Sequence, residues 1–345
     1  KTWFRYSLLV SCFLFFELFF AYGGLSLTKI GVYDGLRSFL PETNDNRYVF
    51  HPTLGATPNP TFSNQSTSHT PGGLRATATP FNLSLPHIAV FGGSTTYDVG
   101  VTSNNKTWVS VLNETLDEFT VSNNGVPGYS TAEHVVQTAF YANRSGAVPV
   151  CSIYYIGWND IRNFGFSELD SGYSRFHMLS QYGNLDVRYS LNSISPTLNL
   201  LSFFILRSEL PFPIISGELG KDVTLEDRMF EIAANNLRTI SAVNRSRETK
   251  TVFIPQMLNR AKLTDSTKQH GWLPFVYDVD VWPLQERFNV MVEELAGSLG
   301  DYYIDPDINT FNSSDFVDNG HFNDVGAAKM ASAIANDVGS VCDGN

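Results

Sequence analysis

The chain has 345 residues, of which 43% are hydrophobic, and it carries a formal charge of −11. This length and composition suffice for one large domain with a full core or for two modest ones. An acidic surface repels phosphate backbones, and lysine and arginine form no basic stripe along the sequence. Nucleic acid is therefore excluded as an expected partner.

The cysteines limit the classes of metal and disulfide chemistry. Cys12, Cys151 and Cys342 are too few and too scattered for a zinc cage. We expect no metal and no cofactor. Cys151 and Cys342 can pair if the domain faces an oxidising compartment. The alternative is a buried free thiol at Cys151, within an expected strand, and this is the reading that we favour from the sequence.

Residues 1–22 form an apolar stretch close to the ~20 residues that a membrane-spanning helix needs. Lys1 and Arg5 lie at its start, before the apolar run that begins at Ser7, which predicts a cytoplasmic N-terminus and export of the rest of the chain. We expect a membrane anchor here, although Glu17 is costly in hydrocarbon. A cleaved signal segment, which would leave a secreted protein, and a buried core helix are the alternatives.

Residues 23–86 carry little regular pattern. Thr57–Pro80 is dense in Thr, Ser, Pro, Asn and Gly, which predicts a linker that spaces the main domain from the membrane. Within this segment, Gly73-Leu74-Arg75 is the candidate for a part that folds onto the domain.

From residue 87 to 340, short apolar runs alternate with helical patterns, which predicts an α/β domain with a parallel sheet. Residues 161–223 interrupt the alternation and are expected to be an insertion, with an apolar run at Leu198–Ile205 that either covers the site or packs on the core. The expected strands are Ile88–Phe91, Phe119–Asn123, Val150–Ile156, Thr251–Ile254 and Tyr302–Ile304; the expected helices are Lys106–Glu118, Ala132–Asn143, Leu225–Val243, Leu284–Leu299 and Val325–Val338.

Polar residues follow the ends of the expected strands. Ser94 comes after the first strand and two glycines, Gly128 after the second strand, and Asn159 after the third. Asp318 and His321 precede the last helix. Since the carboxyl ends of parallel strands meet at one edge, these five residues are expected to converge there.

This set matches the requirements of serine hydrolysis. A neutral imidazole at His321 takes the proton of the Ser94 hydroxyl, and a carboxylate at Asp318 orients the imidazole. The backbone N–H groups of Ser94 and Gly128 and the side-chain amide of Asn159 would supply oxyanion donors.

The same residues make the chain resemble the SGNH hydrolases, also called GDSL esterases and lipases, from about His87 to Val338. Four blocks occur in the family's order: Gly92-Gly93-Ser94-Thr95-Thr96, Asn124-Gly125-Val126-Pro127-Gly128, Gly157-Trp158-Asn159-Asp160 and Asp318-Asn319-Gly320-His321. The resemblance implies a flavodoxin-like three-layer α/β/α sandwich with a five-stranded parallel sheet, and ester hydrolysis without metal. The chain departs from the pattern at Gly93, where the family name implies Asp.

Other polar residues are given structural roles. Asp160 is expected to hold the loop after the third strand, while Asp98 and Gln256 are weaker candidates for lining the pocket. The histidines outside the four blocks show no metal-ligand spacing and are expected to be structural or on the surface: His87, His134, His177 and His270.

The sequence therefore predicts a serine esterase that hydrolyses acyl or acetyl esters, is tethered to a membrane or exported, and acts on a small-molecule, lipid or glycan ester. One alternative is an O-acetyltransferase that uses the same triad on an exported polysaccharide. A second is a non-catalytic carbohydrate- or lipid-binding module on the same fold. The sequence leaves the acyl-chain length, the alcohol moiety and the oligomeric state open.

Overall fold

The computed structural model describes residues 2–29, 46–167, 169–173, 197 and 217–343. By their contacts the residues form two units, which are considered separately: residues 1–48 with 182–215, and residues 49–181 with 216–345.

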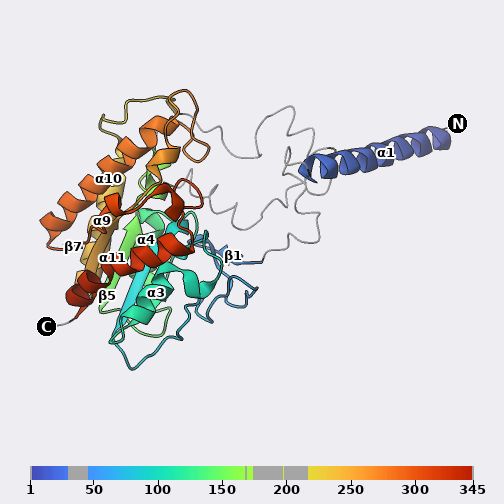
Figure 1. The fold of residues 1–345 in the computed structure, drawn as a ribbon. Helices are drawn as coiled ribbons and strands as arrows, with labels where there is room; N and C mark the ends of the chain where they lie inside the picture. Colours follow the sequence, from blue (N-terminus) through green and yellow to red (C-terminus); the bar gives the residue numbers. More distant parts are fainter. Residues whose placement is uncertain (1, 30–45, 168, 174–196, 198–216, 344–345) are drawn as a thin grey trace. The chain divides into compact units, whose positions relative to one another are not determined.

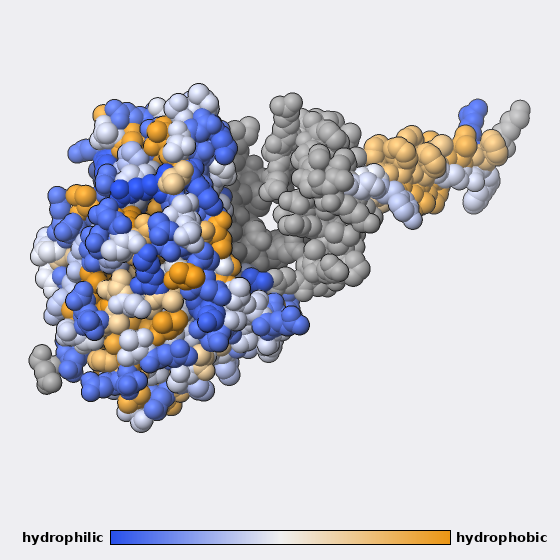
Figure 2. Space-filling model, viewed as in Figure 1, coloured by the Kyte–Doolittle hydropathy of each residue, from blue (hydrophilic) through white to orange (hydrophobic). Residues whose placement is uncertain are grey.

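Helix α1 (Thr2–Lys29) is the described element of the first unit. Its apolar part, Trp3–Gly23, spans 21 residues with a mean hydropathy of 1.6, and none of its most apolar window is buried. Figure 2 shows the hydrophobic surface of this helix. Its length and composition are those of a membrane span and equally of a signal sequence.

The second unit is built on a five-stranded parallel sheet, as the sequence predicted. The strands lie in the order β4-β3-β5-β6-β7. The chain starts in an inner strand, adds β4 on one side, and then places the remaining strands on the other side. This is the flavodoxin-like order, in which the site forms where the direction of winding reverses. The strands are β3 (His87–Gly92), β4 (Thr120–Asn123), β5 (Cys151–Ile156), β6 (Lys250–Pro255) and β7 (Tyr302–Tyr303).

Helices cover both faces of this sheet, which confirms the expected three layers (Figure 1). The strand β3 is apolar on both faces, so both faces must be covered. Ile88 and Val90 pack in one apolar cluster, and Ala89 and Phe91 pack in the other. The first cluster lies under α3 (Trp108–Thr115) and α11 (Asp324–Cys342); the second lies under α4 (Thr131–Tyr141), α9 (Arg228–Arg245) and α10 (Asp278–Leu299).

The helix α10 begins at Asp278, six residues before the expected start at Leu284. Asp278 and Asp280 lie in its first turn, where carboxylates interact favourably with the positive end of the helix dipole. Pro283 lies inside the helix. The expected start at Leu284 directly follows this proline, but the buried apolar face of the helix already begins at Val281.

The Ser/Thr/Pro-rich segment differs most from its expected role as a linker. Residues 49–86 belong to the same unit as the sheet. They include the second strand of a two-stranded sheet formed by β1 (Tyr48–His51) and β2 (Gly55–Pro58), and Leu74 and Arg75 are buried. Side chains such as Asn59 and Asn64 accept backbone hydrogen bonds within their own turns, so a polar composition is compatible with a packed structure here.

The ends of the expected insertion, residues 161–223, also belong to the core. Phe164, Tyr173 and Val223 are buried in the cluster under α9 and α10. An isolated bridge pairs Phe166 with Gly217 across the two ends. The apolar run Leu198–Ile205 lies outside the described residues.

Cys151 and Cys342 form a disulfide, so our preference for a free thiol at Cys151 was wrong. The bond joins the first residue of β5 to the last residue of α11, and their Cα atoms are 5.5 Å apart. The two cysteines are 191 positions apart in the sequence, so no local sequence pattern indicates that they pair.

We expect Cys342→Ser to lower the free energy of unfolding by about 3–5 kcal/mol, because the bond closes a long loop in the unfolded chain. Urea unfolding of the full chain, followed by tryptophan fluorescence, measures the change. Cys12→Ser is the matched control, because Cys12 is exposed and unpaired. Equal stability of Cys342→Ser and the unreduced wild type would contradict a stabilising role for the bond.

Candidate active site

Ser94 begins the one-turn helix α2 (Ser94–Tyr97) directly after β3, at the carboxyl edge of the sheet. A Cβ atom on Gly92 would overlap the Thr96 hydroxyl, and one on Gly93 would overlap the amide nitrogen of Asn159. The turn therefore requires glycine at both positions. The Asn159 amide occupies the space that a side chain at position 93 would need.

The structure brings Ser94, His321 and Asp318 together. Ser94 Oγ lies 2.7 Å from His321 Nε2, and His321 Nδ1 lies 2.7 Å from Asp318 Oδ2. With the proton on Nδ1, the imidazole donates to the carboxylate and accepts from the serine hydroxyl; this tautomer is assigned from the partners. The three side chains thus form a continuous hydrogen-bonded chain across 227 residues of sequence.

The Asp318 carboxylate is held by its own turn. Its Oδ1 accepts the backbone N–H groups of Gly320 (2.9 Å) and His321 (2.8 Å). Partial burial by itself would raise the pKa of Asp318, but the hydrogen bond and charge of His321, together with these two N–H groups, lower it to about 2. The carboxylate is consequently ionised at any pH well above 2, and its side chain remains 53% exposed.

Asn159 lies in the one-turn helix α5 (Trp158–Ile161) that follows β5, and Gly128 lies in the loop after β4; β5 and β4 are the two neighbours of β3. The amide nitrogen of Asn159 donates to Tyr129 O (2.7 Å) and keeps a second hydrogen, and Asn159 is only 7% exposed. Gly128 has a φ of 82°, in the region that favours glycine. The backbone N–H groups of Ser94 and Gly128 make no hydrogen bond within the described part of the chain.

Side chains from distant segments fix the carbonyl groups of the α2 turn. The indole N–H of Trp108 donates to Thr95 O (3.0 Å), and the amide of Asn123 donates to Thr96 O (2.9 Å). The hydroxyl of Thr95 itself donates to Gln256 (3.1 Å). These bonds satisfy the carbonyls that a one-turn helix leaves without internal partners.

Arg75 fixes the end of the same turn. Its guanidinium donates to Tyr97 O (2.5 Å) and Asp98 O (2.8 Å), and stacks over the Tyr97 ring at 4.6 Å. A third bond reaches Asn104 (3.2 Å), and Arg75 is only 2% exposed. Sequence reasoning missed Arg75 as a positioning residue, because its place in a polar, irregular segment carries no local signal of contact with the Ser94 turn.

Asp98 and Gln256, the weaker candidates for lining the pocket, lie beneath the turn. Asp98 is fully buried, and burial raises its pKa to about 8, although the Trp108 N–H and Arg75 oppose the shift. Gln256 is 1% exposed and donates to the Tyr155 hydroxyl (3.0 Å). Both residues therefore support the site from within the core.

Two further residues hold the loops around Ser94. His270 accepts the backbone N–H groups of Trp272 (3.1 Å) and Leu273 (3.3 Å) at Nδ1, and its Nε2 lies 3.0 Å from the side-chain amide of Asn319. Asp160 is buried and accepts the backbone N–H and the hydroxyl of Thr131. Across the described ranges, no group of three or more His, Cys, Asp or Glu residues is placed to hold a metal ion.

No family model matches the sequence, and no curated protein matches it. Solved structures with similar folds include a GDSL-like lipase from Bacteroides thetaiotaomicron (8% identity, 75% of this chain and 91% of that chain, TM-score 0.42). Others are a member of the lipolytic protein G-D-S-L family from Veillonella parvula (15%, 72% and 96%, 0.41) and a variant of an acetyl-xylooligosaccharide esterase from Geobacillus (10%, 73% and 94%, 0.42). At these scores the similarity carries no functional argument, which rests on the geometry of the site.

We expect Arg75→Met to slow labelling of Ser94 by a fluorophosphonate by about 10²-fold, because the Tyr97 and Asp98 carbonyls lose their donor and the turn shifts. The labelling rate is measured at a temperature at which circular dichroism shows both proteins folded. Arg238→Met, which removes an exposed arginine bonded to Asn235 within α9, is the matched control. An unchanged rate in folded Arg75→Met would refute the positioning role.

Proposed function

We propose that this chain is a serine esterase of the SGNH type that hydrolyses carboxylic esters. The observation that carries the proposal is the unbroken chain from Ser94 Oγ through His321 to the ionised Asp318, at the carboxyl edge of the sheet. The four sequence blocks that resemble the SGNH hydrolases place their serine, aspartate and histidine on these three residues.

The chemistry follows from the hydrogen-bond directions. Ser94 Oγ attacks the ester carbonyl carbon while His321 Nε2 takes the hydroxyl proton. The tetrahedral intermediate collapses, the alkoxide leaves as an alcohol with the proton from His321, and an acyl-serine remains. Water then attacks this ester, gives a proton to His321, and releases the carboxylic acid with Ser94 restored. Asp318 stabilises the imidazolium at both stages without accepting its proton.

The oxyanion that forms at each stage needs donors that are in place beforehand. Backbone N–H groups of Ser94 and Gly128, both without hydrogen bonds in the described structure, and the second amide hydrogen of Asn159 fit this role. The bond from Asn159 to Tyr129 O orients the amide so that its nitrogen faces the Ser94 turn.

Ser94→Ala and His321→Ala should each lower kcat for p-nitrophenyl acetate by at least about 10³-fold, because either change breaks the nucleophile–base pair. Release of p-nitrophenol measures the rate, and circular dichroism checks folding. Ser332→Ala is the matched control, since Ser332 is an exposed serine of α11 that bonds only to Ala328 O.

In the same assay, Asn159→Ala keeps both the nucleophile and the base, and should lower kcat by about 10²–10³-fold as one oxyanion donor is lost. Wild-type rates in folded Ser94→Ala or His321→Ala would end the proposal of a triad. A wild-type rate in Asn159→Ala would remove only that donor from the oxyanion site.

We further propose that α1 anchors the chain in a membrane and that the α/β unit is exported. The length and hydropathy of Trp3–Gly23, with Arg5 in its first turn, support a span with a cytoplasmic N-terminus. The Cys151–Cys342 disulfide supports an oxidising compartment for the α/β unit, because such bonds are rare where thiols are kept reduced.

For the chain expressed in a bacterial host, protease added to spheroplasts should degrade the α/β unit while a cytoplasmic marker survives. Immunoblotting detects the unit, and its presence in the membrane fraction separates an anchor from a cleaved signal segment. Protection of the α/β unit in intact spheroplasts, with degradation after lysis, would contradict export.

A further inference from the structure

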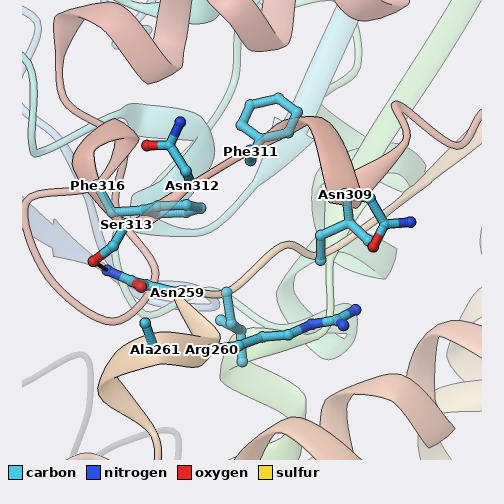
Figure 3. Close-up of a pocket in the computed structure, with 10 residues that line it drawn as sticks. Asn259, Arg260, Ala261, Asn309, Phe311, Asn312, Ser313 and Phe316 are labelled. Carbon is cyan, nitrogen blue, oxygen red and sulfur yellow. Dashed lines mark hydrogen bonds between the residues drawn. The ribbon is translucent and has the colours of Figure 1, made fainter.

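A pocket of about 270 Å³ lies between the loops that follow β6 and β7 (Figure 3). One wall is Leu258–Ala261 and the other is formed from residues 308–316. Asn259 joins the first wall to the candidate active site: its backbone N–H donates to Asn319 O (2.8 Å), and its amide donates to Asp318 O (3.3 Å). Ser94, Asp318 and His321 do not line the pocket, so it is a separate cavity attached to the turn that carries Asp318 and His321.

The lining combines an apolar floor with amide groups. Leu258 and Phe316 are buried, and Phe311 is half-buried beside them. Asn309 and Asn312 lie on the other wall (Figure 3), where Asn309 Nδ2 donates to Asp307 (3.3 Å) and Asn312 Oδ1 accepts the Ser314 N–H (3.1 Å). The volume is slightly below the range of about 300–1,000 Å³ that suits drug-sized ligands. The pocket is therefore matched to one ring-sized polar group, and its amides do not suit a long acyl chain.

Arg260 is the only charged residue among the described residues that line the pocket. Its guanidinium carbon lies 3.7 Å from the centroid of the Trp282 ring, which holds the plane of the group. Within the described ranges Arg260 makes no side-chain hydrogen bond and no ion pair, so the N–H edge of the guanidinium is available. In Figure 3 its side chain extends along the pocket below Asn309.

Resting on the proposed esterase function, we infer that this pocket binds a ring-sized group with a single carboxylate in the alcohol portion of the ester. A planar guanidinium matches a carboxylate with two parallel hydrogen bonds, and one cation balances one negative charge. The assignment to the alcohol portion follows from His321, which must protonate the leaving alkoxide. The leaving group therefore lies on the His321 side of Ser94, and that turn is the one bonded to Asn259.

The kinetic test compares 4-acetoxybenzoate with its neutral isostere 4-acetoxybenzamide. In Arg260→Gln, the ratio of kcat/KM for the acid over the amide should fall about tenfold, mostly through KM for the acid, because a charge-assisted hydrogen bond is lost. Arg238→Gln makes the same charge change outside the pocket and should keep the wild-type ratio. An unchanged ratio in Arg260→Gln overturns the inference.

The rate on p-nitrophenyl acetate, which carries no carboxylate, separates this inference from the proposed function. That rate should be equal in the wild type, Arg260→Gln and Arg238→Gln. Loss of the acid-over-amide preference at a constant p-nitrophenyl acetate rate supports the pocket. An equal loss of activity on all three esters would mean that Arg260 acts through the fold, and would overturn its role in recognition.

Direct binding tests the pocket even if the chain has no esterase activity. Titration calorimetry compares 4-hydroxybenzoate with 4-hydroxybenzamide, and D-glucuronate with D-glucose, so that aromatic and sugar acids are distinguished. The wild type should bind at least one acid about tenfold more tightly than its neutral partner, and Arg260→Gln should lose this difference. Absence of any Arg260-dependent preference in both pairs overturns the inference.

Discussion

The turn that begins at Ser94 is fixed from several sides, and the rest of the candidate site depends on it. Within the turn, backbone hydrogen bonds run only to the carbonyl oxygens of Gly93 and Ser94, so the carbonyls of Thr95, Thr96 and Tyr97 need partners from elsewhere. Trp108, Asn123 and Arg75 each donate to one or two of its carbonyls, from three separate segments of the chain. Because these donors belong to different layers and loops, the serine hydroxyl is positioned by the whole α/β unit.

The strand order explains why the remaining site residues meet this turn. The strand β3 lies between β4 and β5, so the loop that carries Gly128 and the one-turn helix that carries Asn159 are the immediate neighbours of the Ser94 turn. His321 lies near the end of the sequence, just before α11. The helices α11 and α3 pack on the same face of the sheet. The site thus needs no long or unusual loop to bring residues 94 and 321 into contact; it follows from the winding of the chain about its first strand.

Much of this arrangement could be predicted from the sequence, because it is encoded locally. The strands β3, β4 and β5 are short, buried runs, and the segments that directly follow them carry Ser94, Gly128 and Asn159. The full matches of residues 157–160 and 318–321 to short motifs then indicated the roles of Asn159, Asp318 and His321. Arg75 and the Cys151–Cys342 pair could not be found in this way, since neither has a local pattern and each depends on a contact far along the sequence. For residues 49–86, composition was misleading because polar turns there satisfy their own backbone groups.

The helix α11 runs from beside His321 to Cys342, and thus from the carboxyl edge of the sheet to the amino end of β5. Lys250 Nζ also donates to Val341 O (2.7 Å) at this far end. Cys342, the last residue of α11, is therefore a full helix length away from the segment that carries His321. A group attached beyond Cys342 is remote from the reactive serine, whereas removal of residues from α11 takes away part of the apolar cluster on this face of the sheet.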